Sequence, residues 1–398
     1  MLTLDMIYHA AFMLKNVARK TDIIKAPRLS ETTNIYLKTE NLQTTGSFKI
    51  RGSAYKISQL SDEEKKNGIV ACSAGNHAQG VAMAATKNGI KSTIFMPDAA
   101  PISKVEATKR LGAEVVLVPG GYDAAAEAAE KFVQEKNATL IHPFNDEQVM
   151  AGQGTIGLEI LDQMENVDAV IVPVGGGGLI SGVAFAIKSL RPDIKVYGVQ
   201  AAGSASMVES LKKGEPFMID SASTFADGIA VRCPGDHTFD AVSKYVDDVV
   251  TVSEDEIATA ILALIEKQKL ITEGAGAVSV AAAMFDKLPI QGKNVVCILS
   301  GGNIDVNILS RVITRGLVRS GRNVDLTIAL EDKPGQLESV SRIIAACGGN
   351  VVSVQYDRSD VNMAITSCFL KLALETRDSA QIEQIKQKLT EEGFRIVS

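Results

Sequence analysis

The sequence contains no tryptophan, and phenylalanine and tyrosine together make up only 5% of its 398 residues. The hydrophobic cores must therefore be built from aliphatic side chains, and an apolar share of 46% is ample for that purpose. Blocks of positive charge are also missing, since lysine and arginine are scattered and the formal net charge is −6. This charge pattern argues against nucleic acid or an anionic membrane surface as a partner.

Cysteine is scarce, and no two cysteines form a C-x-x-C pair. The odd number and the apolar neighbours of Cys72 and Cys297 favour reduced, buried thiols in a cytoplasmic protein. The four histidines show no spacing typical of metal ligands, so no metal site is predicted. The chain begins without a basic segment followed by an apolar one, and we expect no signal peptide. The full sets are Cys72, Cys233, Cys297, Cys347 and Cys368, and His9, His77, His142 and His237.

Residues 169–187 form an uncharged segment about as long as a membrane span. Pro173 and the glycines that follow it divide this segment in two. A buried strand, a glycine turn and an apolar helix explain it better than a membrane helix does.

Short apolar runs alternate with amphipathic helical stretches through the first three quarters of the chain. This alternation predicts an α/β fold with open parallel sheets covered on both faces, whose ligands bind at the carboxyl ends of the strands. The expected strands are 35–39, 69–73, 92–96, 114–118, 169–174, 195–200, 247–252 and 294–299. The expected helices are 47–59, 76–88, 101–111, 121–135, 149–164, 179–190, 254–267 and 275–285.

The pattern changes after residue 315, where the basic, glycine-bearing segment 316–323 is interpreted as a linker. Residues 324–398 then predict strand, helix, two strands, helix and strand, which is the βαββαβ order of a ferredoxin-like domain. The expected strands are 324–330, 350–357, 363–374 and 394–397, and the expected helices are 335–346 and 379–390.

One lysine stands out in the segment 41–52, where Lys49 lies between a turn and the expected start of a helix. Gly46 and Ser47 are typical of a turn and an N-cap, and Phe48 offers an apolar surface beside the amine. A lysine held partly out of water can lose its proton and act as a nucleophile. The alternative is an ordinary solvated lysine at a helix start.

Three further motifs follow expected strands and open helices or turns. The first is Ser73-Ala74-Gly75-Asn76-His77, whose small residues let backbone N–H groups approach an anion such as a substrate carboxylate. An ordinary turn capped by Asn76 is the alternative, and the role of the His77 side chain stays open.

The second motif is the glycine run Gly175-Gly176-Gly177-Gly178 followed by Leu179. Four glycines are conformationally costly, and close approach to a phosphate is their natural explanation. No Gly-Lys-Ser/Thr follows, and position 180 is isoleucine, so the run fits neither a P-loop nor a dinucleotide fingerprint. The third motif, Ser300-Gly301-Gly302-Asn303, places a hydroxyl where it can hydrogen-bond a ring nitrogen, and by itself it also fits a tight turn.

Taken together, these motifs resemble those of the pyridoxal-phosphate enzymes of fold type II, and within them the threonine dehydratases (threonine ammonia-lyases). The resemblance covers residues 5–315, where the motifs occur in the order of the family. It implies pyridoxal 5'-phosphate as the cofactor and a two-domain catalytic unit over residues 1–315. A smaller subdomain of residues 48–149 would lie beside a larger one formed by residues 1–47 and 150–315.

The resemblance also implies a role for each motif residue. Lys49 resembles the lysine that forms a Schiff base with the cofactor, and Phe48 the residue that packs on the cofactor ring. Asn76 resembles the partner of the phenolic oxygen, and Ser300 that of the pyridine nitrogen. The run from Gly175 to Gly178, with Leu179, resembles the phosphate cradle. Residues Ser73, Ala74, Gly75, Asn76 and His77 resemble the loop that binds the substrate carboxylate, and Ser73 also the serine that moves a proton in racemising relatives.

One segment departs from the family pattern. Many serine racemases and dehydratases of this family bind a divalent cation through two acids and a carbonyl on one loop. Gln200 and Ser206 stand where those acids are expected, so the sequence predicts no such metal site and makes a dedicated serine racemase less favoured.

Residues 324–398 resemble an ACT domain, and the segment 331–337 matches the first β–α turn of such a domain. A helix that begins after Pro334 and Gly335 would offer its N-terminus to the carboxylate of a regulatory amino acid, with isoleucine or valine as candidates. The alternative is that this domain only pairs subunits through its sheet.

The sequence therefore predicts a cytoplasmic threonine dehydratase that deaminates L-threonine to 2-oxobutanoate and ammonia and also acts on L-serine. Its expected partners are the amino-acid substrate and an amino-acid effector, in a homodimer or homotetramer, without nucleic acid or membrane. A serine dehydratase or racemase on the same scaffold and a catalytically inactive amino-acid sensor are the alternatives.

Overall fold

In the computed structural model, which describes residues 1–358 and 364–397, the chain forms two compact units. They comprise Met1–Asp305 and Val306–Ser398. The division therefore comes earlier in the chain than the expected boundary after residue 315. Residues 316–319, expected in the linker, are the end of helix α13 (Val306–Arg319). One glycine in a helix costs only about 1 kcal/mol, so the amphipathic pattern of the segment prevails over Gly316.

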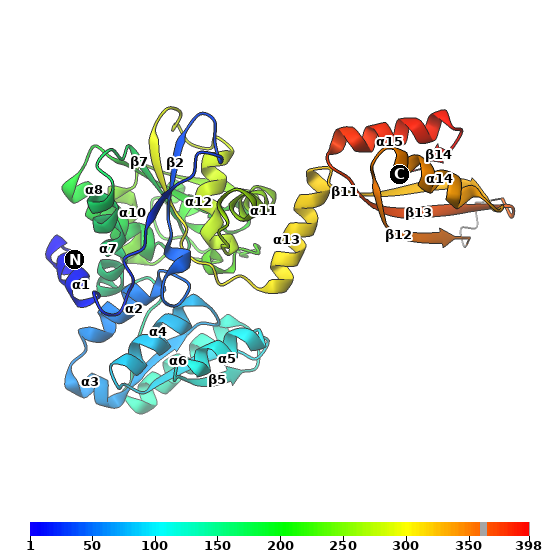
Figure 1. Ribbon diagram of the computed structural model, residues 1–398. Coiled ribbons are helices and arrows are strands. Elements are labelled where there is room, and N and C mark those ends of the chain that lie inside the picture. Colours follow the sequence, from blue (N-terminus) through cyan, green and yellow to red (C-terminus); the bar gives the residue numbers. More distant parts are fainter. Residues whose placement is uncertain (359–363, 398) are drawn as a thin grey trace. The chain divides into compact units, whose positions relative to one another are not determined.

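The larger sheet of the first unit has six strands in the order β1-β2-β10-β7-β8-β9. Every neighbouring pair is parallel except β1 and β2, which are antiparallel. Figure 1 shows helices α7, α8 and α10 on one side of β2 and β7, and α11 and α12 on the other. The strands are β1 (Ile23–Lys25), β2 (Asn34–Lys38), β7 (Ala169–Pro173), β8 (Lys195–Ala201), β9 (Asp248–Val252) and β10 (Asn294–Ile298).

Both faces of this sheet are covered, and the central strand β7 is accordingly buried at every position. Its continuous run of Ala, Val and Ile is what the sequence pattern of a two-sided buried strand predicts. The covering helices are α7 (Glu147–Gln163), α8 (Gly178–Leu190), α10 (Asp236–Tyr245), α11 (Glu254–Ala263) and α12 (Gly274–Met284).

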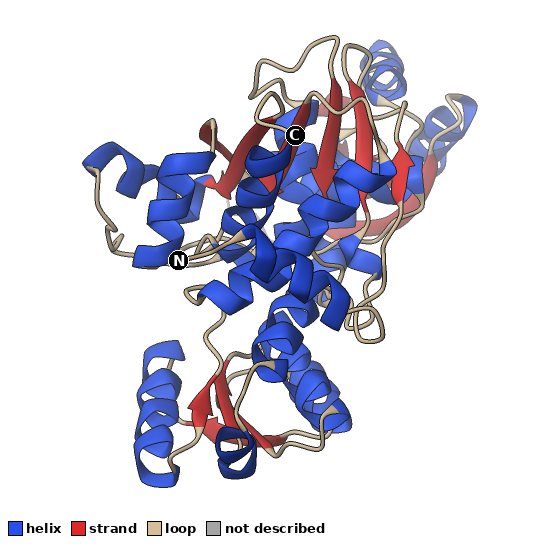
Figure 2. Cartoon of the chain, turned by 90° about the vertical axis from the view of Figure 1, so that its left-hand side faces the viewer, coloured by secondary structure: helices blue, strands red, loops and turns tan. Residues whose placement is uncertain are grey.

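A smaller, fully parallel sheet has four strands in the order β5-β4-β3-β6. Figure 2 shows the strands of the two sheets as separate groups flanked by helices. Helix α2 packs against both α4 and α7, which places it where the two sheets' helices meet. The elements are β3 (Ile69–Cys72), β4 (Ser92–Pro97), β5 (Glu114–Val118), β6 (Thr139–Leu140), α2 (Lys49–Ser58), α3 (Asp62–Asn67), α4 (Asn76–Lys87), α5 (Ile102–Arg110) and α6 (Tyr122–Lys136).

Helices α7 and α8 pack closely against each other, because glycines line their interface. A Cβ atom added at Gly182 would lie 2.1 Å from the backbone oxygen of Met150, and one at Gly154 would lie 2.9 Å from the oxygen of Gly182. These glycines therefore set how near the two helices can approach.

The second unit has the predicted βαββαβ order and an antiparallel sheet in the order β12-β13-β11-β14. Leu326, Ile328, Leu370, Leu372 and Leu374 alternate inward from β11 and β13 and form a core with the two helices. The expected start of strand 363–374 at Met363 lies outside the described residues, and the strand is observed from Ser367. The elements are β11 (Asn323–Glu331), α14 (Gln336–Ala346), β12 (Asn350–Asp357), β13 (Ser367–Glu375), α15 (Ser379–Glu391) and β14 (Arg395–Ile396).

Several short elements were not expected from the sequence. They are helices α1 (Leu4–Met13), α3, α9 (Ser206–Lys213) and α10, strands β1 and β6, and the 3-10 turns Glu40–Leu42, Ala202–Ser204 and Asp227–Ile229. The end of the expected helix 254–267 is π-helical, from Leu264 to Gln268. In the part of the chain that the structure describes, no helix is long and apolar enough to cross a membrane. The uncharged segment 169–187 instead contributes to β7 and α8.

Candidate active site

The lysine segment and the three motifs that follow strands open into one pocket of about 970 Å³, a volume typical of small-molecule sites. The pocket lies at the carboxyl ends of β3, β7 and β10, where ligands bind in parallel sheets. Every site residue predicted from the sequence lines it, namely Phe48, Lys49, Ser73, Ala74, Gly75, Asn76, His77, Gly175, Gly176, Gly177, Gly178, Leu179 and Ser300.

Lys49 is the first residue of helix α2, and its amine enters the pocket. The Nζ atom donates a hydrogen bond to the Pro143 oxygen at 2.8 Å and lies 5.4 Å from the centre of the Phe48 ring. Burial lowers the pKa of the amine to about 8, although the nearby Glu273 carboxylate acts in the opposite direction. Roughly a tenth of the amine is therefore uncharged at pH 7, far more than in a solvated lysine.

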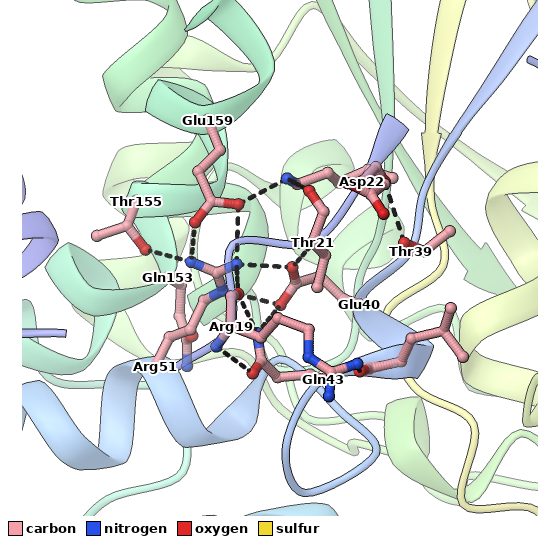
Figure 3. A network of polar contacts seen from close by, with 12 residues as sticks. Arg19, Thr21, Asp22, Thr39, Glu40, Gln43, Arg51, Gln153, Thr155 and Glu159 are labelled. Atoms are coloured by element: carbon pink, nitrogen blue, oxygen red, sulfur yellow. Dashed lines mark hydrogen bonds and ion pairs between the residues drawn. The ribbon is translucent and has the colours of Figure 1, made fainter. Parts of the chain in front are cut away.

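A buried ion network anchors the helix that carries Lys49 (Figure 3). Arg51, two residues further along α2, makes ion pairs with Glu40 at 2.8 Å and with Glu159 on α7 at 2.6 Å. Lys38 on β2 contacts the other oxygen of Glu159 at 2.6 Å. Because these side chains come from four separate segments, the network fixes the start of α2 against the larger sheet.

The charges of this network compensate one another inside the protein. Burial acts to raise the pKa of Glu40, but the charge of Arg51 and its hydrogen bonds outweigh burial and hold the pKa below its ordinary value. Burial lowers the pKa of Lys38, and Glu159 opposes that effect. Removing one member would leave its partner charged and unpaired in the interior.

The segment Ser73–His77 connects β3 to helix α4, whose N-terminus faces the pocket. The hydroxyl of Ser73 accepts a hydrogen bond from the N–H of Gly75 at 3.2 Å. The side chain of His77 turns away, with Nε2 at 2.7 Å from the Ile141 oxygen. Burial lowers the pKa of His77 to about 3, and the charge of Lys49 adds to this effect. His77 is thus neutral and structural, and only its backbone is available to a ligand.

The glycine run ends β7 and begins α8, and its backbone lies closer to neighbouring side chains than any residue with a Cβ atom would allow. A Cβ atom at Gly176 would lie 2.4 Å from the Phe144 ring, and one at Gly177 would lie 2.9 Å from the Cβ atom of Thr238. Gly177 also has a φ of 97°, which favours glycine. The result is a helix N-terminus whose N–H groups are open to an anion.

Ser300 follows β10 and is joined directly to the lysine segment. The N–H of Phe48 donates to the Ser300 oxygen at 3.0 Å, and Ser47 forms an isolated antiparallel bridge with Gly301. The Ser300 hydroxyl donates to the Ala275 oxygen at 3.3 Å and lines the pocket. The first and last motifs of the catalytic unit therefore form one connected surface.

Sequence reasoning missed several charged residues of this pocket, above all Glu273. Burial raises the pKa of Glu273 to about 7, with a further contribution from the charge of Asp227. Lys104, Asp123, Asp227 and Arg232 also line the pocket. Glu273 precedes Gly274, Ala275 and Gly276 at a helix start, and this pattern of small residues resembles the other motifs. Nothing comparable in the sequence marks the other four charged residues.

Gln200 and Ser206, which stand where the family resemblance places the acids of a cation site, have buried and uncharged side chains. The Gln200 Oε1 atom accepts from the N–H of Val208 at 3.0 Å, so the amide helps to shape the loop. Across residues 1–358 and 364–397 there is no group of three or more His, Cys, Asp or Glu side chains that could hold a metal ion.

A family model described as "Pyridoxal-phosphate dependent enzyme" matches residues 14–301. The chain therefore belongs to the pyridoxal-phosphate-dependent enzyme family. It is 51% identical over its whole length to an L-threonine ammonia-lyase of Thermotoga maritima, of which it covers 99%. It is also 49% identical, over 78% of its length and 92% of the other chain, to L-threonine dehydratase catabolic TdcB of Staphylococcus aureus.

Solved structures agree with this assignment. The processed form of threonine deaminase isoform 2 from Solanum lycopersicum superimposes with a TM-score of 0.74 and 37% identity, covering 78% of this chain and 88% of the other. A maize serine racemase superimposes with a TM-score of 0.75 and 33% identity, covering 80% and 98%. Both the fold type II architecture and the cofactor class follow from these likenesses.

The pocket fits pyridoxal phosphate on its own chemistry. Lys49 supplies an amine of lowered pKa, and the glycine run lines the pocket at the N-terminus of α8, where backbone N–H groups can bind a phosphate. Phe48 provides an aromatic surface, and the Ser300 hydroxyl provides a neutral hydrogen-bonding group. An amine, an anion cradle and an aromatic wall are the groups that an aldehyde cofactor with a phosphate requires.

Proposed function

We propose that this protein is an L-threonine ammonia-lyase that converts L-threonine to 2-oxobutanoate and ammonia and also acts on L-serine. The observation that carries the proposal is the Lys49 amine, held in the 970 Å³ pocket with a pKa of about 8. The full-length likeness to an L-threonine ammonia-lyase supports threonine as the substrate.

The first task of the pocket is to orient the amino acid. The N–H groups at the start of α4 face the pocket and bind the substrate carboxylate in the segment Ser73–His77. The glycine run at the start of α8 would hold the phosphate of the cofactor. Two helix N-termini would therefore hold two anions in the pocket that Lys49 also lines.

The second task is proton transfer. Lys49 takes the α-proton of the substrate at Nζ, and its lowered pKa provides the unprotonated amine that a base requires. Pyridoxal phosphate, when bound, supplies the electron sink for the charge left on the α-carbon. In balance, the α-proton and the β-hydroxyl are lost as one water, and the 2-aminocrotonate that remains takes up one water to give 2-oxobutanoate and ammonia. A neutral partner such as the Ser300 hydroxyl would leave that electron sink moderate, which favours prompt loss of the β-hydroxyl.

Product analysis with the purified holoprotein tests this proposal. Wild type should release 2-oxobutanoate from L-threonine and pyruvate from L-serine, and Lys49→Ala should abolish both. Lys56→Ala is the matched control, because Lys56 lies on the same helix, is paired with Asp146 at 2.8 Å and does not line the pocket. Product formation by Lys49→Ala, or none by wild type, would contradict the proposal.

The same assay separates the alternatives. A serine racemase, which the likeness to the maize enzyme makes the second candidate, would convert L-serine to D-serine without releasing ammonia. Chiral chromatography of the serine reaction distinguishes this outcome. An inactive amino-acid sensor would bind threonine without product, and no 2-oxo acid would appear.

We further propose that residues 324–398 act as an ACT domain that binds a regulatory amino acid. Helix α14 begins after Gly335, which has a φ of 90°, and its N-terminus offers N–H groups to a carboxylate. Isoleucine and valine are the candidate effectors. The melting temperature of the full chain should rise with increasing isoleucine or valine concentration. If it does not shift, the remaining role for this domain is to pair subunits through its sheet.

We propose a homodimer or homotetramer, because β12 is an edge strand of its sheet with Val352, Val354 and Tyr356 exposed. Light scattering after size-exclusion chromatography checks this, and a monomeric mass would contradict it. The five free cysteines support a cytoplasmic location.

A further inference from the structure

Asn76 lies in the middle of a chain of hydrogen bonds that joins four segments far apart in sequence. Its Oδ1 atom accepts from the Asn303 amide at 2.7 Å, and its Nδ2 atom donates to the Glu273 carboxylate at 2.6 Å. The Asn303 Nδ2 atom also donates to the Thr45 oxygen at 2.9 Å. We call these four groups, from Thr45 to Glu273, the Asn76 chain.

The direction of every hydrogen bond in the Asn76 chain follows from one end. The Thr45 group is a backbone carbonyl, which can only accept, so the Asn303 atom beside it must be the amide nitrogen. That same nitrogen lies against Asn76, so the facing Asn76 atom must be the oxygen. The Asn76 nitrogen is thereby turned toward Glu273, a carboxylate that accepts.

The surrounding backbone is built around this arrangement. A Cβ atom at Gly301 would lie 2.4 Å from the Glu273 Oε1 atom and 3.1 Å from the Asn76 nitrogen, and one at Gly46 would lie 2.3 Å from the Asn303 Oδ1 atom. The N–H of Glu273 also donates to the Gly301 oxygen at 3.1 Å. Glycines thus make room for both ends of the chain.

We propose that Glu273 and Asn303 are positioning residues, which lock the Asn76 amide so that its remaining N–H is directed at an acceptor oxygen of the bound cofactor. This inference depends on pyridoxal phosphate as the cofactor and does not depend on which amino acid is the substrate. An Asn76 amide with the opposite orientation would present its carbonyl oxygen and repel a negatively charged oxygen of the ligand. The sequence motifs assigned no role to the Asn303 side chain and did not include Glu273.

The test measures the affinity of cofactor-free full-length protein for pyridoxal phosphate by absorbance titration, without substrate. Asn303→Asp keeps the size of the side chain but replaces the donor N–H group with an oxygen that faces the Thr45 and Asn76 oxygens. Glu273→Ala removes the oxygen that accepts from the Asn76 amide. Each should weaken cofactor binding about tenfold or more and displace the pH titration of the bound cofactor's absorption. Glu273→Gln keeps an acceptor oxygen and should stay within about threefold of wild type.

Asn88→Asp is the matched control, because it makes the same substitution at the other end of helix α4, where the Asn88 amide bonds only the Ala84 oxygen. It should leave cofactor affinity unchanged. Melting curves of each cofactor-free variant identify misfolding, and Asn303→Ser serves if Asn303→Asp does not fold.

Wild-type affinity and wild-type absorption in both Asn303→Asp and Glu273→Ala would overturn the proposal. So would equal losses in Glu273→Gln and Glu273→Ala, since the charge rather than the acceptor geometry would then matter. A protein that binds pyridoxal phosphate but makes no 2-oxobutanoate would contradict the proposed substrate while leaving this inference intact.

Discussion

At the scale of single residues, the pocket places ionisable groups where the surrounding protein shifts their pKa values. Lys49 and Glu273 lie in the same pocket, and burial moves their pKa values toward each other, to about 8 and about 7. A base of intermediate pKa suits proton transfer near neutral pH. Burial of these two groups also lowers the stability of the cofactor-free fold when they are charged, because each charge has lost part of its hydration.

This cost can be measured through Lys49. Replacing it with methionine in the cofactor-free protein should raise the free energy of unfolding by roughly 3 kcal/mol at pH 7. The unfolded state retains the proton up to pH 10.5 and the folded state only up to about 8, so wild type gains stability as pH rises between these values. The advantage of the Lys49→Met variant should therefore be constant below pH 8 and shrink above it.

Denaturant unfolding of both proteins at several pH values tests this, with Lys131→Met as a control for the loss of one surface lysine. A Lys49→Met variant that is less stable than wild type at pH 7 would show that the amine is well solvated.

The buried ion network gives a second prediction at this scale. Arg51→Met should lower the free energy of unfolding by about 3–5 kcal/mol, because Glu40 and Glu159 would lose their shared partner inside the protein. Arg191→Met removes an exposed arginine that pairs with Asp193 at 2.8 Å, and it should be nearly neutral. Equal effects of the two substitutions on the denaturation midpoint would contradict the anchoring role of Arg51.

At the scale of elements, glycines determine how closely helices and loops approach. In the glycine run they expose N–H groups to an anion, whereas at Gly154 and Gly182 they let α7 and α8 touch through their backbones. Helix α7 also carries Glu159 and packs against α2. The spacing of α7 and α8 therefore affects the position of Lys49.

Gly182→Ala tests this spacing. Its Cβ atom would lie 2.1 Å from the Met150 oxygen and 2.6 Å from the Gly154 nitrogen, both of which belong to backbone that cannot move alone. We expect a loss of about 1–3 kcal/mol in unfolding free energy. Gly121→Ala is the control, since no atom lies within 4 Å of a Cβ added there, and a large loss in that variant alone would refute the packing argument.

At the scale of the whole molecule, the chain separates into a unit that contains the complete pocket and a second unit with a core of its own. Every residue that lines the pocket belongs to Met1–Asp305. Catalysis and amino-acid regulation are therefore expected to be separable.

Deleting residues 324–398 should leave turnover of L-threonine within about threefold of the full chain, because no pocket residue is removed. It should also abolish any change in turnover caused by isoleucine or valine. Steady-state rates with and without each amino acid, measured on both proteins, check this prediction. An effect of these amino acids that survives the deletion would place their binding site in the first unit.

The sequence alone determined the alternation of strands and helices, the βαββαβ unit and the loops that meet in the pocket. Local patterns suffice for these features, because carboxyl ends of parallel strands lie at one edge whatever the details of packing. All thirteen residues that the motifs singled out line the pocket, although their individual roles stay predictions. Short elements such as β1 and β6 escaped because so few residues carry little periodic information.

Only the tertiary structure decided which distant groups meet. Glu273 contacts Asn76 across 197 positions of sequence, and Arg51 contacts Glu159 across 108. No local pattern encodes such pairs, since each depends on how two packed layers bring separate loops together. The pKa values of Lys49, His77 and Glu273 belong to the same level, because burial and the nearest charges set them. Sequence motifs thus identify most residues of the site, whereas packing determines their protonation and orientation.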